Sequence, residues 1–252
     1  MISLEDHIRL IDFSAGYGKK DVISNVYAEI RKPGINTILG RNGSGKTTLL
    51  RSLIKYTGRS SGKAMFGDVD IDDICVEDLP CYVSYSPAIL NESMGFTAIN
   101  IVSSARKGNG WVEKDDAMKA LGLLNATSLA YRNFSELSAG QMRIVLMARA
   151  VASESPTIML DEPTSNLDVA NKAAVIGIMK GLSSRGFAIL VATHDLEVAF
   201  ASDWIIAMKD GKVIRSGKRE DIISSASLSE LYGTRINVLR RNGRAIAYVA
   251  DL

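Results

Sequence analysis

The sequence predicts an α/β fold in which a parallel sheet with crossover helices follows an antiparallel β layer and is interrupted by a helical insert. Three observations support this. Strand-like and helix-like segments alternate between residues 157 and 202, the apolar period changes from strand to helix near residue 40, and residues 89–150 read as helices. With 252 residues, of which 46% are hydrophobic and 23% charged, the chain can bury a large core.

The first third of the chain reads mainly as strands. Alternating residues in Ile8–Phe13 and the segment Val22–Ile30 predict a small antiparallel layer, which a Pro-Gly turn connects to a buried strand over Ile35–Leu39. The apolar residues between positions 49 and 54 then lie on one helical face, and Gly58 is the expected end of that helix.

The middle and last parts of the chain contain the remaining elements. Helices are predicted at Thr97–Arg106, Val112–Leu124 and Ala139–Ala152, with a break at Gly108–Gly110. Alternating strands and helices follow at Thr157–Leu160, Val169–Leu182, Phe187–Thr193 and Leu196–Ser202. Asp210-Gly211 and Asn242-Gly243 predict hairpin turns in the tail.

Charge and cysteine content give no support to several classes of function. The formal charge is +2, with 30 basic and 28 acidic side chains, so we expect no nucleic-acid partner. Cys75 and Cys81 have no second pair to complete a zinc site and are expected to be buried small hydrophobes. Glu5 and Asp6 precede any apolar stretch, and no window approaches 18 apolar residues, so we expect a cytoplasmic chain. If it works at a membrane, another chain must supply the spanning helices.

The strongest motif is a phosphate-binding loop (P-loop) between the predicted buried strand and the predicted helix. Glycines let the backbone wrap around phosphates, successive N–H groups form an anion site, and the helix N-terminus adds a positive dipole. Lys46 is expected to reach the β- and γ-phosphates and Thr47 to hold Mg²⁺. The nucleotide-binding residues are Gly40, Arg41, Asn42, Gly43, Ser44, Gly45, Lys46, Thr47 and Thr48.

A magnesium-nucleotide site also needs an acidic residue at the end of a neighbouring strand. The apolar run at 157–160 ends in Asp161 and Glu162. Asp161 is predicted to bind Mg²⁺, directly or through water, and Glu162 to act as general base on an attacking water. Without the P-loop this pair would be weak evidence, because apolar strands ending in Asp-Glu are common.

Leu137-Ser138-Ala139-Gly140-Gln141, 20 residues before Asp161, resembles the signature motif of ABC-type ATPases, which usually has Gly where Ala139 stands. Three further segments resemble features of this family. They are the D-loop at Ser165-Asn166-Leu167-Asp168, the histidine switch at Thr193-His194-Asp195, and the adenine-stacking aromatic at Tyr17. Simpler structural roles exist for some of them: Tyr17 as a strand-end aromatic, and Ser138 as a helix N-cap that would also suit a phosphate site.

The resemblance implies a P-loop ABC ATPase core with an N-terminal antiparallel β layer and a helical insert, formed as one domain of residues 1–252. Its expected parts are a core of 1–87 and 151–226, a signature subdomain of 88–150, and a tail of 227–252. It implies ATP and Mg²⁺ as ligands, catalytic roles for Lys46, Glu162 and His194, and a second nucleotide-binding subunit. Ser138, Ala139, Gly140, Gln141 and Asp168 would contact ATP bound mainly by the other copy.

The resemblance also implies an integral membrane permease as partner and, indirectly, an extracellular substrate-binding protein, with the chain on the inner face of the membrane. The tail with Leu231-Tyr232-Gly233 resembles ATPase subunits of iron-siderophore, haem and cobalamin importers. A soluble assembly ATPase, as in iron–sulfur cluster assembly, remains the alternative, and a small-molecule kinase is a third reading. One departure stands out: Ala88 occupies the position where the family usually carries Gln.

Overall fold

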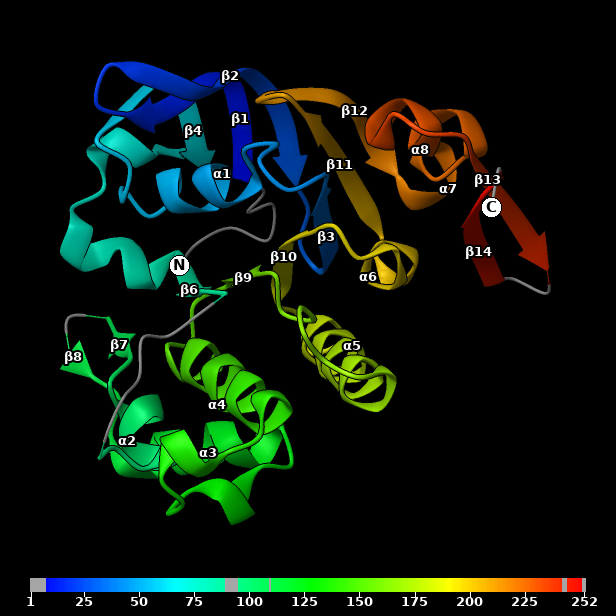
Figure 1. Cartoon of the computed structure of the whole chain (residues 1–252). Helices are drawn as coiled ribbons and strands as arrows, with labels where there is room; N and C mark the ends of the chain where they lie inside the picture. Colours follow the sequence, from blue (N-terminus) through cyan, green and yellow to red (C-terminus); the bar gives the residue numbers. More distant parts are fainter. Residues whose placement is uncertain (1–7, 89–94, 109, 242–243, 251–252) are drawn as a thin grey trace.

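The computed structural model describes residues 8–88, 95–108, 110–241 and 244–250. Figure 1 shows two sheets in the upper part of the molecule, a helical region below them and a hairpin at the right. The antiparallel sheet has the strand order β2-β1-β4-β5, and the larger sheet has the order β12-β11-β3-β10-β9-β6. This is the predicted α/β architecture, with its antiparallel layer and helical insert.

The antiparallel sheet forms because apolar side chains of its strands reach one shared core, which includes Phe13, Ile23 and Val26. Bulges interrupt the pairing of the first two strands near Asp12 and Asn25, which both have positive φ, and Asn25 Nδ2 donates to Asp12 Oδ1 at 2.7 Å. The strands are β1 (Ile8–Tyr17), β2 (Lys20–Ile30), β4 (Arg59–Phe66) and β5 (Val69–Asp70).

Strands buried on both faces form the centre of the larger sheet, because every residue of β3, β9 and β10 is buried. β6, β9, β10, β3 and β11 run parallel, and β12 is antiparallel to β11. The strands are β3 (Gly34–Leu39), β6 (Val83–Ser86), β9 (Thr157–Asp161), β10 (Ala188–Thr193), β11 (Trp204–Lys209) and β12 (Lys212–Lys218). Thr193 pairs with Leu39, and Ala192 with Asp161, so the ends of three strands meet at one edge.

The helices α1 (Lys46–Ser52), α5 (Val169–Ser183) and α6 (Leu196–Ala201) follow the central strands. In the helical region, α2 (Ala98–Ser103), α3 (Lys114–Leu123) and α4 (Ala139–Ala152) share one core that continues into the parallel sheet. The tail contains α7 (Arg219–Ile222), α8 (Ser225–Tyr232), β13 (Ile236–Arg241) and β14 (Arg244–Val249). Short elements complete the chain: β7 (Arg106–Lys107), β8 (Gly110–Trp111) and four 3₁₀ turns at Ile71–Asp73, Val76–Cys81, Thr127–Leu129 and Phe134–Glu136.

Most predicted elements are present within a few residues, and Ala139–Ala152 is confirmed at both ends. The predicted end of the first helix is wrong. The helix ends at Ser52, and Lys55, with φ 56°, closes the turn that follows, where Tyr56 N donates to Arg51 O at 2.9 Å and Lys55 N to Ser52 O at 3.0 Å. Gly58 lies beyond this turn. The helix predicted to reach Arg106 ends at Ser103, because Arg106 pairs with Trp111 in a short hairpin.

The prediction of buried cysteines is also wrong, because Cys75 and Cys81 are both exposed at the ends of a surface 3₁₀ turn. The predicted turn at Asp210-Gly211 is confirmed: both residues have positive φ, as a two-residue hairpin turn requires. Asn109 and the predicted turn at Asn242-Gly243 lie outside the described residues, although β13 and β14 pair as a hairpin around the latter.

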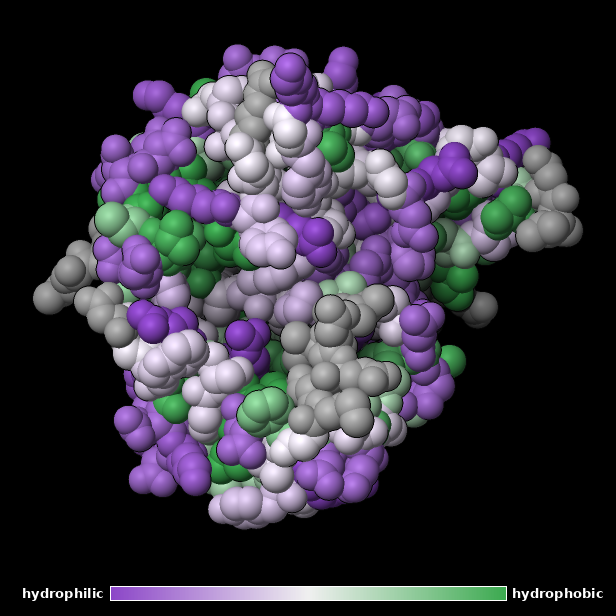
Figure 2. All heavy atoms as spheres, turned by 60° about the vertical axis from the view of Figure 1, so that its left-hand side comes forward, coloured by the Kyte–Doolittle hydropathy of each residue, from purple (hydrophilic) through white to green (hydrophobic). Residues whose placement is uncertain are grey.

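Among the residues described, no helix is long and apolar enough to cross a bilayer. On the face shown in Figure 2, hydrophobic residues form separate patches among hydrophilic ones.

Candidate functional site

The glycine-rich loop of residues 40–45 joins β3 to α1. Gly43 and Gly45 have φ values of 82° and 100°, a region that strains residues with a side chain. A Cβ atom at Gly40 would lie 2.4 Å from the carbonyl oxygen of Met208. The loop therefore needs glycines both for its curvature and for its close contact with β11.

A pocket of about 330 Å³ opens at this loop. Between two of the lining glycines, the Ser44 hydroxyl is buried and has no hydrogen-bond partner among the described residues. This hydroxyl lies against Gly40 inside the loop, and Ser44 is not among the residues that line the pocket. The pocket is lined by Val22, Asn42, Gly43, Gly45, Lys46, Thr47, Thr48 and Glu162.

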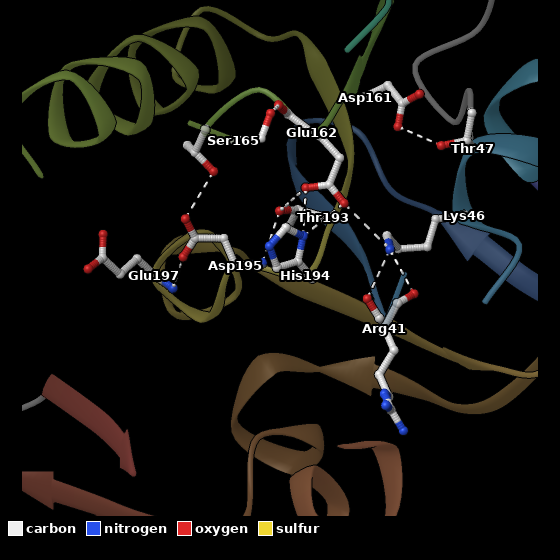
Figure 3. Close-up of polar contacts among 12 residues, drawn as sticks. Arg41, Lys46, Thr47, Asp161, Glu162, Ser165, Thr193, His194, Asp195 and Glu197 are labelled. Atoms are coloured by element: carbon white, nitrogen blue, oxygen red, sulfur yellow. Dashed lines mark hydrogen bonds and ion pairs between the residues drawn. The ribbon is translucent and has the colours of Figure 1, made fainter. Parts of the chain in front are cut away.

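Lys46, the first residue of α1, places a cation inside the loop, and its side chain is only 5% exposed. Its Nζ donates to the carbonyl oxygens of Gly40 at 2.9 Å and Arg41 at 3.0 Å. It also lies 3.5 Å from Glu162 Oε1 (Figure 3). The ammonium group is thus positioned between the loop backbone and a carboxylate that lines the same pocket.

Glu162 is the point on which several side chains converge (Figure 3). Thr193 Oγ1 donates to its Oε2 at 3.2 Å, and His194 Nδ1 lies 3.0 Å from Oε2 and 3.1 Å from Oε1. Glu162 has φ 45°, an uncommon conformation for this residue, and is held there because its N–H donates to Ala192 O at 2.8 Å while its carbonyl accepts from Ser165 N at 3.2 Å. The parallel register of β9 and β10 explains the contact with Thr193.

Asp161, the last residue of β9, is 2% exposed, and burial raises the pKa of its carboxyl. Two hydroxyls stabilise the carboxylate: Thr47 Oγ1 donates to Oδ1 at 2.9 Å, and the Tyr85 hydroxyl donates to Oδ2 at 3.1 Å. Burial and the neighbouring Asp161 raise the pKa of Tyr85 to about 12, so its hydroxyl remains a donor at neutral pH. This pair of hydroxyls holds Asp161 beside the start of α1.

Arg51 connects this acidic residue to the end of β1. Its guanidinium lies near the hydroxyls of Tyr17 and Tyr85, and these neighbours raise the pKa of Arg51. Tyr17 ends β1 and remains 42% exposed, so part of its ring is accessible. The structure therefore adds a hydroxyl contact to the stacking role predicted for Tyr17.

The signature residues form the start of α4. Ser138 is its N-cap: Gln141 N donates to Ser138 Oγ at 3.3 Å, and Ser138 N donates to Gln141 Oε1 at 3.1 Å. Ser138 and Ala139 are exposed, whereas Gly140 is buried. A Cβ atom at Gly140 would lie 2.5 Å from Asn171 Oδ1, so a larger residue would require the Asn171 side chain to move.

Asn171 joins the signature to the predicted D-loop. Asp168 caps α5, because its Oδ1 accepts from Asn171 N at 2.7 Å and its Oδ2 accepts from Asn171 Nδ2 at 2.9 Å. The same Asn171 side chain presses against Gly140. Two motifs 28 positions apart in the chain, at Gly140 and Asp168, are therefore in indirect contact.

Ala88, predicted to stand where the family usually carries glutamine, lies just after β6. The buried guanidinium of Arg143 on α4 donates to the carbonyl oxygens of Pro87 at 3.1 Å and Ala88 at 2.8 Å, and burial lowers the pKa of Arg143. Hydrogen bonds from the helical region therefore hold the backbone at Pro87 and Ala88. On β6, the side chain that contacts Asp161 is Tyr85.

A larger cavity of about 620 Å³ lies between α5, α6, α7 and the C-terminal hairpin. Two of its cations, Arg219 and Arg240, are already engaged. Arg219 Nη1 donates to Phe200 O at 3.0 Å, and Arg240 Nη2 donates to the carbonyls of Glu220 and Ile223 at 2.8 Å. These bonds tie the hairpin to the core, and the chemistry of the molecule is concentrated at the smaller P-loop pocket.

A phosphate-binding loop after one parallel strand, with an acidic pair at the end of a nearby parallel strand, defines the class of P-loop nucleotide triphosphatases. Residues 23–165 match the family described as ABC transporter, and the chain belongs to this family of ABC ATPases. The chain is 32% identical over 243 residues to an uncharacterized ABC transporter ATP-binding protein of Methanocaldococcus jannaschii, covering 94% of both chains.

Relatives whose names include a transported substrate are less similar to this chain in sequence than that Methanocaldococcus jannaschii protein. A petrobactin import ATP-binding protein of Bacillus anthracis is 29% identical over 92% of this chain and 96% of its own, and a hemin import ATP-binding protein of Rhodococcus jostii is 28% identical over 88% and 78%. A solved inward-facing ABC transporter described as metal-chelate type matches with 24% identity and a TM-score of 0.78, covering 99% and 98% of the two chains. A dimeric bacterial ABC transporter cassette matches with 25% identity and a TM-score of 0.71, covering 84% and 98%.

The structure brings the predicted P-loop, Asp161, Glu162 and His194 together at one edge of the sheet. It places Ser138–Gln141 against α5 instead, and these signature residues are not among those that line the P-loop pocket. Sequence reasoning did not assign roles to Tyr85, Arg143 or Asn171. Two of them carried a signal in the sequence. Tyr85 lies two residues before Pro87 on a predominantly buried strand, and Asn171 lies three residues after the capping Asp168.

Proposed function

We propose that the chain binds and hydrolyses ATP as the motor subunit of a membrane importer. The observation that carries this proposal is the convergence of Lys46, Thr193 and His194 on Glu162 beside the P-loop pocket. A carboxylate held within 3.5 Å of the P-loop cation is suitably placed to act on a water that attacks a phosphate bound in the loop.

The residues present suit a magnesium nucleotide. Loop N–H groups can donate to phosphate oxygens, and Lys46, which lines the same pocket, can add charge-assisted hydrogen bonds. Among the described residues no group of three or more His, Cys, Asp or Glu could hold a metal ion, whereas Mg²⁺ in such sites uses one or two protein oxygens together with phosphates. Thr47 and Asp161 would hold Mg²⁺, which when bound neutralises charge on the phosphates.

Glu162 would accept the proton of the attacking water. Contacts with Thr193 and His194 orient its two oxygens, so the carboxylate is held in one rotamer at the pocket. Tyr17 would stack on adenine, and the other P-loop residues, including Arg41, Asn42 and Thr48, would enclose the phosphates.

We infer that the active form is a dimer of two copies. Ser138 and Ala139 are exposed at a helix N-terminus and are not among the residues that line the P-loop pocket of their own chain. This location suits contact with ATP bound by a second copy, with Asp168 in the adjoining loop. The existence of a dimeric relative supports the inference. ATPase activity that rises with the square of protein concentration at high dilution is expected, and a linear dependence would favour a self-contained site.

The names of the relatives support a finer reading. Relatives are named for hemin and petrobactin import, so we propose a substrate of the iron-siderophore, haem or cobalamin type, an integral membrane permease and, indirectly, an extracellular binding protein. The chain would act on the cytoplasmic face of the membrane, with residues 88–150 as a signature subdomain between core segments 1–87 and 151–226 and a tail of 227–252. Copurification without any integral membrane protein would favour the alternative, a soluble assembly ATPase.

The Glu162→Gln variant tests the catalytic part of this proposal. It preserves the shape of the side chain and removes the base, so ATP binding should persist while hydrolysis falls by roughly 10²- to 10⁴-fold. Single-turnover hydrolysis and calorimetric ATP binding measure the two effects. Glu77→Gln, at an exposed glutamate on a surface turn, is the matched control. Hydrolysis by Glu162→Gln at the parent rate would exclude Glu162 as the base.

A further inference from the structure

The hydroxyl of Tyr232 links the C-terminal tail to His194, the histidine proposed to be catalytic. Tyr232, the last residue of α8, donates its hydroxyl to the backbone carbonyl of His194 at 3.0 Å. Gly233 then ends the helix with φ 68°, and its N–H donates to Ser229 O at 2.8 Å. Leu228 and Leu231 anchor the helix, because each is 1% exposed in the core cluster of the tail. Tyr232 is therefore fixed on a rigid element.

The segment that it contacts is a bend between β10 and α6. On one side, Thr193 belongs to a fully buried strand. On the other side, Asp195 caps α6 by accepting from Glu197 N at 2.9 Å, and Lys172 Nζ lies 2.8 Å from its Oδ2. His194 lies between these two anchors, and Tyr232 is the side chain that holds its carbonyl.

His194 itself needs such support. Its side chain is 49% exposed, and its imidazole reaches Glu162 with only one nitrogen, Nδ1. A half-exposed ring has few packing contacts to fix its orientation, so the position of its backbone decides where Nδ1 lies. Small displacements of a group that orients a catalytic base are costly, because the reaction requires near-attack geometry.

The hydroxyl of Tyr232 remains a donor under physiological conditions. Burial, together with the negative charges of Asp195 and Glu162, raises the pKa of Tyr232 well above its usual range. The ring lies beside two acidic groups and stays neutral, so the hydrogen bond to His194 is available throughout the neutral pH range.

We propose that Tyr232 is a positioning residue for ATP hydrolysis, which holds the His194 carbonyl so that the imidazole meets Glu162. The inference rests on the proposed catalytic roles of Glu162 and His194. It assigns the Leu231-Tyr232-Gly233 segment of the tail a role in ATP hydrolysis. Leu231 anchors the helix, Tyr232 contacts the His194 carbonyl and Gly233 ends the helix.

The Tyr232→Phe variant tests this proposal, because it removes the hydroxyl and keeps the ring. Loss of one neutral hydrogen bond should lower kcat roughly three- to tenfold, with KM for ATP and calorimetric ATP affinity unchanged. Tyr248→Phe is the matched control: this tyrosine lies in the same tail, and its hydroxyl accepts from Asn237 Nδ2 at 3.4 Å on the hairpin. Unchanged kcat in Tyr232→Phe would overturn the proposal.

A double-mutant cycle separates positioning from general destabilisation. If Tyr232 acts through His194, the Tyr232→Phe/His194→Ala variant should hydrolyse ATP at the rate of His194→Ala alone. A further loss by the same factor as in the single variant would show that Tyr232 does not act through His194. If His194→Ala retains the parent rate, the proposed catalytic role of His194 is wrong. This outcome distinguishes failure of the proposed site from failure of the role of Tyr232.

A spectroscopic readout is independent of activity. The chain has two histidines, so imidazole ¹H–¹⁵N correlation spectra contain few signals, and His7→Gln assigns them. Tyr232→Phe should shift the His194 imidazole signals in the protein without nucleotide, whereas Tyr248→Phe should leave them in place. Identical His194 signals in the parent and Tyr232→Phe would contradict the proposal.

Discussion

The Tyr85→Phe substitution removes a hydroxyl that donates to Asp161 Oδ2 at 3.1 Å. Asp161 is 2% exposed, so water does not readily replace this donor. A hydrogen bond to a charged acceptor contributes about 1.5–3 kcal/mol. Groups that orient a metal-binding carboxylate typically change metal affinity by about 10- to 100-fold when removed. We therefore expect the Mg²⁺ concentration needed for half-maximal ATP binding to rise about tenfold or more in the variant.

The assay is calorimetric or fluorescent titration of Mg²⁺ into protein and ATP in the Glu162→Gln background, where hydrolysis does not interfere. Tyr27→Phe, at a tyrosine 59% exposed on β2, controls for loss of a hydroxyl. ATP affinity without Mg²⁺ should not change, because the P-loop itself is untouched. A lower melting temperature with an unchanged Mg²⁺ requirement would refute the reasoning and leave Tyr85 as a structural residue.

Three further predictions concern the signature, the substituted glutamine position and the helical region. Gly140→Ala should destabilise the protein by about 1–2 kcal/mol in urea unfolding, because its Cβ displaces Asn171, and the cost should disappear in an Asn171→Ala background. Ala88→Gln should raise ATP turnover about tenfold if ordering one water is worth about 1.4 kcal/mol, and unchanged turnover would show that the role has moved to another residue. Hydrogen bonds from Lys107 and Lys119 lower the pKa of Asp116 from 3.8 to about 2, so it stabilises the fold above pH 3.8, and this contribution is lost as pH falls toward 2. Asp116→Asn should flatten that part of the stability curve in pH-dependent unfolding, and an unchanged slope would contradict the assignment.

Local signals in the sequence were sufficient to predict where much of the candidate site lies. The P-loop pattern places Lys46 and Thr47 at the start of α1 because glycine spacing and the change of period act over a few residues. The N-cap at Ser138 is likewise a local feature, and α4 begins at Ala139 as expected. By contrast, the end of α1 was missed, because a Lys adopted the left-handed conformation that glycine usually provides.

Cys75 and Cys81 show why a residue type alone did not predict burial. Cysteine is buried on average, but these two flank a surface turn whose core contact is made by Leu79. Burial is decided by which neighbouring residue the chain uses to reach the core, and that depends on the complete fold.

By itself, the sequence determined the α/β class, the positions of most strands and helices, the phosphate-binding loop and the acidic pair, because these follow from apolar periods and from motifs confined to short stretches of chain. Tertiary structure decided the contacts between distant segments. The register of β9 against β10 brings Thr193 and His194 to Glu162, packing of α5 brings Asn171 to Gly140, and the position of α8 brings Tyr232 to His194. Such contacts depend on how sheets and helices pack in three dimensions, and no local pattern of residues encodes that packing.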